Sequence, residues 1–205
     1  GRTIENNDLK KKNFVYKSIN FNTKESIQNE YSKINDLNGN LSALINVAGI
    51  SLAERNSDSF MKTIQTNLVL TYQSCEAFAD LMTEKNPSSI INVTSIGAHF
   101  GFPSNPSYTA SKAAVSNLSK SLAIDYAQKK IRVNNIVPGY VKTDMTIKSY
   151  SEVELRQQRL NRMIINRWGE PKDLVGAAVF LSSNASSYIT GTDIVVDGGW
   201  TARGI

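Results

Sequence analysis

Short apolar runs alternate with longer amphipathic stretches along almost the whole chain, and this alternation limits the possible folds most strongly. The apolar runs, which we predict to be strands, cover residues 14–19, 41–47, 89–94, 131–137 and 192–196. The longer stretches, which we predict to be helices, cover residues 23–34, 58–84, 108–130, 151–165 and 171–182. Nearly continuous apolar strands that alternate with helices indicate a parallel sheet covered on both faces. The sequence therefore predicts a doubly wound α/β fold in a single domain over residues 1–205.

Two of the predicted helices carry local start signals. Ser151 and Glu154 have the spacing of a capping box, and Pro171 occupies a first-turn position that suits proline. We therefore expect one helix to begin at Ser151 and another near Pro171.

The single cysteine and the single histidine limit the chemistry that the chain can perform. Cys75 alone cannot form an internal disulfide, which fits a reducing compartment, so we expect a cytoplasmic protein. One histidine and one cysteine cannot build a Cys/His zinc site, and no Asp/Glu motif suggests magnesium, so no metal site is predicted. His99 is interpreted as an incidental loop residue, with a place in a substrate pocket as the alternative.

Positive charge is modest and mostly scattered. The net charge is +5, and basic residues gather only at 10–12 and between Arg156 and Arg167. The arginines are interpreted as a solvated helix face, with contact to an acidic carrier protein or a phosphate as the alternative. No apolar run approaches the roughly 20 residues that span a bilayer. Neither nucleic acid nor a membrane is therefore an expected partner.

Tyr108 and Lys112 are the residues that point most directly to catalysis. Side chains four apart lie on one face of a helix, so the Lys112 ammonium can lie near the Tyr108 hydroxyl. A nearby positive charge favours the phenolate and lowers the tyrosine pKa from its usual value of about 10. The pair then suits general acid/base catalysis, although the spacing alone also fits an ordinary surface pair.

Ser95 ends a predicted strand, at the edge where ligands bind in parallel α/β sheets. The segments 46–49 and 138–143 also follow predicted strands, so all three meet at this edge. A serine hydroxyl there can hydrogen-bond a substrate carbonyl oxygen and stabilise the charge that develops on it. The alternative is a simple turn serine.

These residues together resemble the short-chain dehydrogenase/reductase family. Ser95, Tyr108 and Lys112 match its Ser…Tyr-x-x-x-Lys triad, and Asn67 stands at its fourth catalytic position. Four more segments match further signatures of the family, namely 46–49, 138–144, 167–171 and 188–199. In the first of these segments, Val47 replaces the second asparagine that the family usually has. The resemblance is nearest to the 3-oxoacyl-[acyl-carrier-protein] reductases.

The resemblance implies a role for each of the four residues. Tyr108 donates a proton to the carbonyl during reduction, and Ser95 orients and polarises that carbonyl. Lys112 lowers the Tyr108 pKa and holds the nicotinamide ribose. Asn67 fixes a water that links Lys112 to solvent. The hydride itself belongs to the cofactor's chemistry.

The resemblance also implies a cofactor cleft. Its expected lining consists of Asn20, Phe21, Asn46, Ala48, Gly49, Tyr108, Lys112, Pro138, Gly139, Val141 and Thr143. Arg2 lies just past the family's second strand, where a basic residue favours the 2′-phosphate of NADP, which arginine suits through its forked donors. We therefore expect NADP(H), with NAD(H) as the alternative.

One signature of the family does not occur in the chain. The Thr-Gly-x-x-x-Gly-x-Gly loop, which cradles the pyrophosphate at a helix N-terminus, is missing from the sequence. By resemblance the chain lacks the first strand, first helix and second strand, about 40 residues of the dinucleotide-binding unit. We therefore expect an N-terminally incomplete Rossmann-type domain that is a fragment of a longer enzyme.

The expected activity is that of an NADP(H)-dependent carbonyl reductase with a small-molecule carbonyl or alcohol substrate, including a 3-oxoacyl thioester on a carrier protein. An NAD-dependent sugar or polyol dehydrogenase is one alternative. A non-catalytic binding protein or inactive fragment descended from the family is another. The resemblance also implies a homotetramer or homodimer, formed through the helices at 58–84 and 108–130 and the C-terminal strand.

Overall fold

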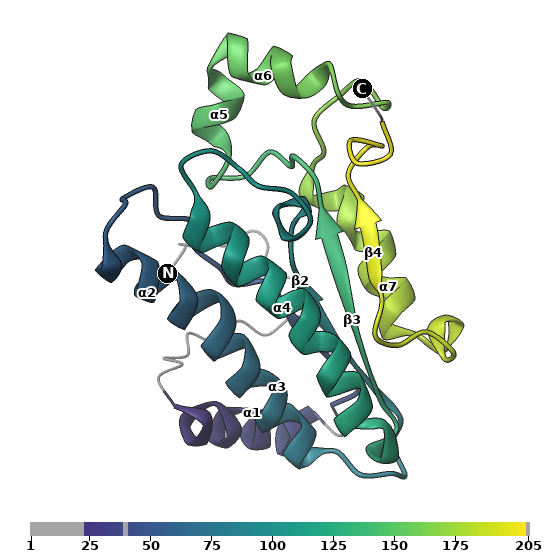
Figure 1. Ribbon diagram of the computed structural model, residues 1–205. Helices are drawn as coiled ribbons and strands as arrows, with labels where there is room; N and C mark the ends of the chain where they lie inside the picture. The colour runs from purple at the N-terminus through teal and green to yellow at the C-terminus, as the bar shows by residue number, and fades with distance from the viewer. Residues whose placement is uncertain (1–22, 39–40, 204–205) are drawn as a thin grey trace.

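The computed structural model describes residues 23–38 and 41–203, and a four-stranded parallel sheet lies at its centre. The strands occur in chain order in the sheet (Figure 1), as β1 (Ala43–Asn46), β2 (Ser88–Val93), β3 (Ile131–Pro138) and β4 (Asp193–Val196). Every neighbouring pair is parallel. This confirms the parallel sheet that the apolar runs predict. The strand expected at 14–19 lies outside the described residues.

Helices cover both faces of the sheet, as a doubly wound fold requires. One face is covered by α1 (Lys24–Asn38), α3 (Leu70–Leu81) and α4 (Pro106–Asp125), whose apolar residues pack on Ile90 and Val133. The other face is covered by α7 (Val175–Ser182), where Leu181 packs on Ile91 and Ile136. Within the described part of the chain, no helix has the length and apolarity needed to cross a membrane.

The helix expected over residues 58–84 is divided by a π-turn. The structure has α2 (Ser57–Ile64), a π-helical segment Gln65–Val69, and then α3. The Leu70 amide bonds to the Gln65 carbonyl, five residues back, so the turn holds one extra residue. Periodic apolar residues continue through the segment, which is why the sequence predicts a single helix there.

The expected helix at 151–165 is wrong in its boundaries and in its cap. The structure has two short helices instead, α5 (Ile147–Ser151) and α6 (Val153–Leu160). Ser151 is the last residue of α5, and the extended residue Glu152 precedes α6 without a side-chain cap. The Glu152 amide closes α5 by bonding to Lys148, so Ser151 cannot act as an N-cap.

Near Pro171 the expected helix begins as a 3₁₀ turn, Pro171–Leu174, which leads directly into α7. A capping box is present here, formed by Glu170 and Asp173. The reciprocal side-chain to backbone bonds satisfy amides that the first turn leaves unpaired.

A row of polar side chains crosses the whole sheet on the side covered by α4. Asn46, Asn92, Asn135 and Asp193 are in-register neighbours on the four strands. Asn46 Nδ2 donates to Asn92 Oδ1 at 2.8 Å, and Asn135 Nδ2 donates to Asp193 Oδ1 at 2.7 Å. Ser119 of α4 bridges the middle of the row, with contacts of 2.9 Å to Asn92 and 2.6 Å to Asn135. The row therefore ties all four strands together and attaches α4 to them.

Candidate active site

The four expected catalytic residues lie together at the carboxyl ends of the strands. Ser95 follows β2, Tyr108 and Lys112 belong to the first turns of α4, and Asn67 lies in the π-turn. Ser111 links two of these elements, because Asn67 Nδ2 lies 3.0 Å from its hydroxyl. In open parallel sheets, this edge is where ligands bind.

Ser95 is held at the start of a short 3₁₀ turn, Ile96–Ala98. Its Oγ accepts the Gly97 amide at 3.0 Å, and the residue is 8% exposed. A serine hydroxyl has one proton to donate in addition to its lone pairs. The Gly97 bond uses one lone pair, so the hydroxyl proton can be donated to a neighbouring oxygen such as that of Tyr108 or of a bound substrate.

Tyr108 lies in the first turn of α4, which begins at Pro106. Burial raises the pKa of its phenol above the ordinary value, and hydrogen bonding with Ser95 acts in the opposite direction. Burial has the larger of these two effects, and the lowering of this pKa by Lys112 stays a prediction. The phenol is therefore protonated at neutral pH and placed beside the serine.

Lys112 is a buried cation in the site, and the residue is only 5% exposed. Its ammonium donates to the Val93 carbonyl at 2.8 Å and lies 5.9 Å from the centroid of the Tyr108 ring. Burial lowers its pKa to about 8, because a charged amine is poorly solvated in the interior. Lys112 can therefore change its protonation state close to neutral pH.

Both polar atoms of the Asn67 side chain form hydrogen bonds within the protein. Its Oδ1 accepts the Ile50 amide at 2.8 Å, and its Nδ2 donates to the Ile50 carbonyl at 2.9 Å. The π-turn directs this side chain inward, where it is 1% exposed. Such turns are frequent at functional sites. Asn67 therefore fixes the loop after β1 against α4.

Gly49 explains why this loop can approach so closely. A Cβ at this position would lie 3.3 Å from Asn67 Oδ1 and 3.4 Å from Lys112 Nζ. Any side chain would thus press on two of the four expected catalytic residues. The neighbouring Ala48 is exposed, while the Asn46 side chain bonds to Ser74 and Asn92 within the protein. A cofactor contact in this turn is therefore expected from the backbone of Ala48 and Gly49 and not from the Asn46 amide.

The segment after β3 closes the other side of the site. Pro138 ends β3, and a Cβ on Gly139 would lie 2.7 Å from the Asp197 backbone, so only glycine fits there. Val141 is buried and pairs with Gly169, and the Thr143 amide donates to Thr146 at 2.9 Å. These bonds hold the predicted cofactor-binding segment in place.

Some of the expected site residues either lie outside the described residues or have a partner within the protein. Arg2, Asn20 and Phe21 lie outside the described residues, so their cofactor contacts stay predictions. His99 Nε2 lies 3.3 Å from Asp193 Oδ2, at the end of the polar row. This contact gives the loop histidine a partner within the protein.

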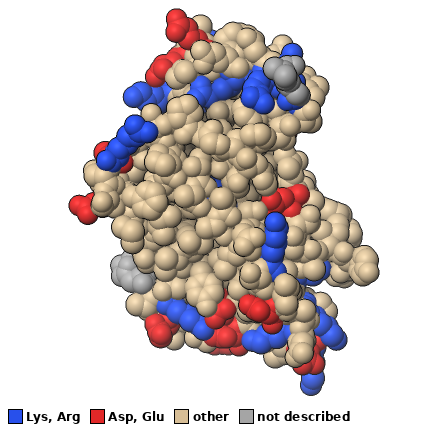
Figure 2. Space-filling view, viewed as in Figure 1, with Lys and Arg blue, Asp and Glu red and all other residues tan. Residues whose placement is uncertain are grey.

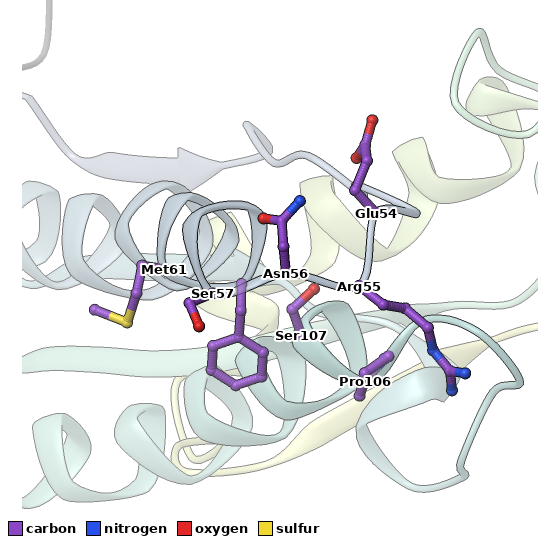
Figure 3. A pocket seen from close by; sticks show the side chains of 8 residues that line it. Glu54, Arg55, Asn56, Ser57, Met61, Pro106 and Ser107 are labelled. Atoms are coloured by element: carbon purple, nitrogen blue, oxygen red, sulfur yellow. The ribbon is translucent and has the colours of Figure 1, made fainter.

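A hollow of about 460 Å³ adjoins the four residues without containing them. Figure 3 shows Arg55 and Met61 at its two ends, with Pro106 and Ser107 of α4 along one side. Ser107 directly precedes Tyr108, so the hollow borders the helical turn that carries the phenol. Sequence patterns gave no indication of this hollow, because its lining comes from one loop and the starts of two helices that lie far apart in the sequence.

The chain is similar to known proteins over most of its length. The family model described as Enoyl-(Acyl carrier protein) reductase matches residues 6–201. The 3-oxoacyl-[acyl-carrier-protein] reductase FabG of Chlamydia pneumoniae is 37% identical over 188 residues, which cover 90% of this chain and 73% of that protein. The gluconate 5-dehydrogenase of Gluconobacter oxydans (strain 621H) is 36% identical over 167 residues, which cover 80% of this chain and 65% of that protein.

A solved structure shares the same fold. The gluconate 5-dehydrogenase from Burkholderia cenocepacia J2315, in complex with NADP and tartrate, matches with a TM-score of 0.84 and 28% identity. The match covers 88% of this chain and 72% of that one. The chain thus spans about two thirds to three quarters of the length of these proteins.

Proposed function

Because this chain belongs to the short-chain dehydrogenase/reductase family, we propose that it is an NADP(H)-dependent carbonyl reductase in which Tyr108 is the general acid. The observation that carries the proposal is the placement of Ser95, Tyr108, Lys112 and Asn67 at one end of the sheet. A buried phenol beside a serine hydroxyl and a buried lysine is a suitable site for proton transfer.

In the proposed reduction, Tyr108 protonates the carbonyl oxygen while Ser95 holds it. Ser95 Oγ accepts the Gly97 amide through one of its two lone pairs, and its hydroxyl proton is the group that would be donated to the substrate oxygen. This oxygen becomes more negative as its carbon is reduced, so both donors stabilise the transition state. The raised Tyr108 pKa keeps the phenol protonated at neutral pH, as a general acid requires.

Lys112 and Asn67 support this proton transfer. The Lys112 ammonium stabilises the phenolate that remains after Tyr108 has given up its proton. With a pKa of about 8, the ammonium can itself release a proton near neutral pH. Asn67 positions the Ile50 loop and Ser111 around Lys112. The water that the family resemblance places beside Asn67 stays a prediction.

The residues after the strands fit the nicotinamide end of NADP(H). The Lys112 ammonium has three N–H donors and uses one on Val93, which leaves donors for a ribose hydroxyl. Gly49 adds a backbone without a side chain beside Lys112, and Thr143 adds a half-buried hydroxyl. When bound, NADPH supplies the hydride. The choice of NADP is supported by the NADP in the Burkholderia structure.

Two substrate classes have support among the relatives. The similarity to the Chlamydia 3-oxoacyl-[acyl-carrier-protein] reductase favours a 3-oxoacyl thioester. The similarity to the Gluconobacter gluconate 5-dehydrogenase favours the second candidate, a sugar or polyol dehydrogenase that uses NAD(H) or NADP(H).

Calorimetric titration of NADPH, and then NADH, into the protein tests the proposal. We expect NADPH to bind more tightly than NADH and to be oxidised when a 3-oxoacyl thioester is added. Tighter binding of NADH, together with oxidation of gluconate when NAD⁺ is supplied, would favour the second candidate. If the folded protein binds neither cofactor, this chain is not itself the reductase, and a non-catalytic binding protein or an inactive fragment is favoured.

We also propose that the protein forms a homotetramer or homodimer and acts in the cytoplasm. Exposed apolar side chains support two contact surfaces, with Tyr72 and Ile124 on α3 and α4, and Val179, Tyr188 and Val195 near the C-terminus. Single exposed apolar residues are common, but groups of them on one face mark association sites. Light scattering coupled to gel filtration tests the assembly, and a monomer at micromolar concentration would contradict it.

A further inference from the structure

Four basic side chains lie on aromatic rings above the active site, and we call Lys142, Arg156, Arg159 and Arg162 the basic cluster. Lys142 and Arg156 lie 4.5 and 5.5 Å from the centre of the Tyr150 ring. Arg159 lies 4.8 Å from the Tyr140 ring, and Arg162 lies 4.2 Å from the Trp200 ring. Aromatic faces attract and hold cations at these distances. The rings therefore keep four positive charges near one another.

The basic cluster has no acidic partner within ion-pair distance in the described part of the chain. Glu152 and Glu154 stand close to Arg156 in the sequence but form no ion pair with the cluster, Asp197 accepts the Gly199 and Thr201 amides, and Asp173 pairs with Arg167. Figure 2 shows basic side chains in a band across the upper part of the molecule, where Figure 1 places α5 and α6. The four cations of the basic cluster are therefore held by aromatic rings and not by carboxylates of the described residues.

Hydrogen-bond donors without acceptors occur in the basic cluster and in the aromatic side chains beneath it. Arg159 Nε, Trp168 Nε1 and Trp200 Nε1 are all buried and have no hydrogen-bond partner among the described residues. The two tryptophans are 6% and 7% exposed. Buried donors are rarely left unpaired in folded proteins, so each unpaired group needs an explanation. Unpaired donors and unneutralised cations together are what an anionic ligand satisfies.

A short series of contacts joins the basic cluster to Ser95. A Cβ on Gly97 would lie 3.4 Å from Ser95 Oγ and 3.0 Å from the Phe102 ring. Phe102 stacks on Tyr140 with ring centroids 6.2 Å apart, and Tyr140 lies under Arg159. The cluster thus lies a few side chains away from the serine that is expected to hold the carbonyl.

We propose that the basic cluster binds a carboxylate or phosphate carried by the substrate, several bonds away from the carbonyl that Ser95 holds. The inference rests on the proposed function, because it names the substrate class of the same site. Arginine suits both groups, since its planar fork of donors matches the oxygens of a carboxylate or a phosphate. A neutral ketone of the same length would leave the cations and the buried donors without partners.

Tryptophan fluorescence tests this binding without any turnover. The chain has two tryptophans, Trp168 and Trp200, and their rings both contact the aromatic side chains under the cluster. Gluconate and inorganic phosphate are titrated at constant ionic strength, and glucitol serves as the neutral match of gluconate. We expect a saturable change with an anion and none with glucitol. Tighter binding of gluconate identifies a carboxylate site, and tighter binding of phosphate identifies a phosphate site.

Matched variants locate the site. We expect Arg159→Gln and Arg162→Gln each to weaken anion binding at least tenfold, while Lys85→Gln, in the exposed loop before β2, leaves it unchanged. Arg162 is exposed, so its variant keeps the test valid if Arg159→Gln folds poorly. An equal loss in Lys85→Gln, or no saturable change with either anion, would overturn the inference.

Turnover separates this inference from the proposed function. With NADPH, we expect a keto acid to be reduced with a higher kcat/KM than its methyl ester, and Arg162→Gln to remove that difference. Reduction of both compounds at equal rates would retain the reductase and overturn the anion site. Anion binding without reduction of any ketone would retain the anion site and overturn the reductase.

Discussion

The Lys112 ammonium donates a hydrogen bond of 2.8 Å to the carbonyl oxygen of Val93, the last residue of β2. This bond joins α4 to the strand that ends just before Ser95. The separation between Tyr108 and Ser95 therefore depends on a buried lysine as well as on the packing of the helix. Lys112 therefore helps to hold α4 against β2, in addition to its proposed role of stabilising the Tyr108 phenolate.

Tyr108→Phe removes the proposed proton donor and little else. We expect turnover to fall roughly 10²- to 10⁴-fold, the usual contribution of general acid catalysis. NADPH binding measured by calorimetry should persist, because the ring still packs in the first turn of α4. The matched change Tyr72→Phe, on the exposed face of α3, should leave turnover within twofold. Full activity in Tyr108→Phe would sink the proposed role.

Lys112 predicts a stability that rises with pH. Burial lowers its pKa from 10.5 to about 8, so between these values the unfolded chain binds more protons than the folded chain. The free energy of unfolding then increases with pH in this interval. From pH 7 to 9.5 we expect a gain of roughly 2 kcal/mol from this group.

Urea denaturation at the two pH values measures this effect. Lys112→Met should lose the gain because methionine does not titrate, whereas Lys85→Met, at an exposed position, should keep it. An identical pH dependence in Lys112→Met and the unmodified protein would show that this lysine is not the responsible group.

Gly49→Ala tests the close approach of the loop after β1. The added methyl group would meet Asn67 Oδ1 at 3.3 Å and Lys112 Nζ at 3.4 Å. We expect turnover to fall roughly tenfold and stability to fall by about 1 kcal/mol, since a small displacement must be accommodated. Gly101→Ala is the control, because nothing lies within 4 Å of its Cβ position. Equal effects at both positions would argue against steric contact as the cause.

Asn92→Ala interrupts the polar row beneath α4. The change removes the oxygen that accepts from Asn46 Nδ2 and the amide that donates to Ser119 Oγ, and each lost bond within the protein costs free energy. We expect the free energy of unfolding to fall by roughly 3 kcal/mol in chemical denaturation. Asn184→Ala, at an exposed position, should change it by about 0.5 kcal/mol or less. A loss as small as that of the control would mean that the row contributes little to stability.

The sequence predicts the parallel sheet and most helices because their apolar patterns are local. The sequence also predicts that Ser95, Tyr108 and Lys112 belong to one site, since Ser95 follows a strand and the other two are one helical turn apart. The sequence does not predict the π-turn, because one inserted residue leaves the pattern of apolar residues almost unchanged. The cap expected at Ser151 is wrong because the Lys148 to Glu152 bond, which ends α5, involves only backbone atoms.

Contacts between distant segments are also beyond the sequence pattern. The Asn46 side chain bonds across strands to Asn92, although the turn motif alone favours a cofactor contact. Arg159 and Arg162 resemble a solvated helix face in the sequence. In the structure they lie on Tyr140 and Trp200, which belong to segments that follow β3 and β4.

The π-turn at Gln65–Val69 makes the position of Asn67 depend on an insertion. Removing one residue from this segment would restore continuous α-helical bonding from α2 into α3, and the local helix would become more regular. The same deletion would rotate the residues on one side of it by about 100°, the angle between successive helical residues. The deletion variant would then have the better helix, while Asn67 could no longer reach Ile50 and Ser111. A deletion in this segment would thus damage the site even though the helix itself would tolerate it.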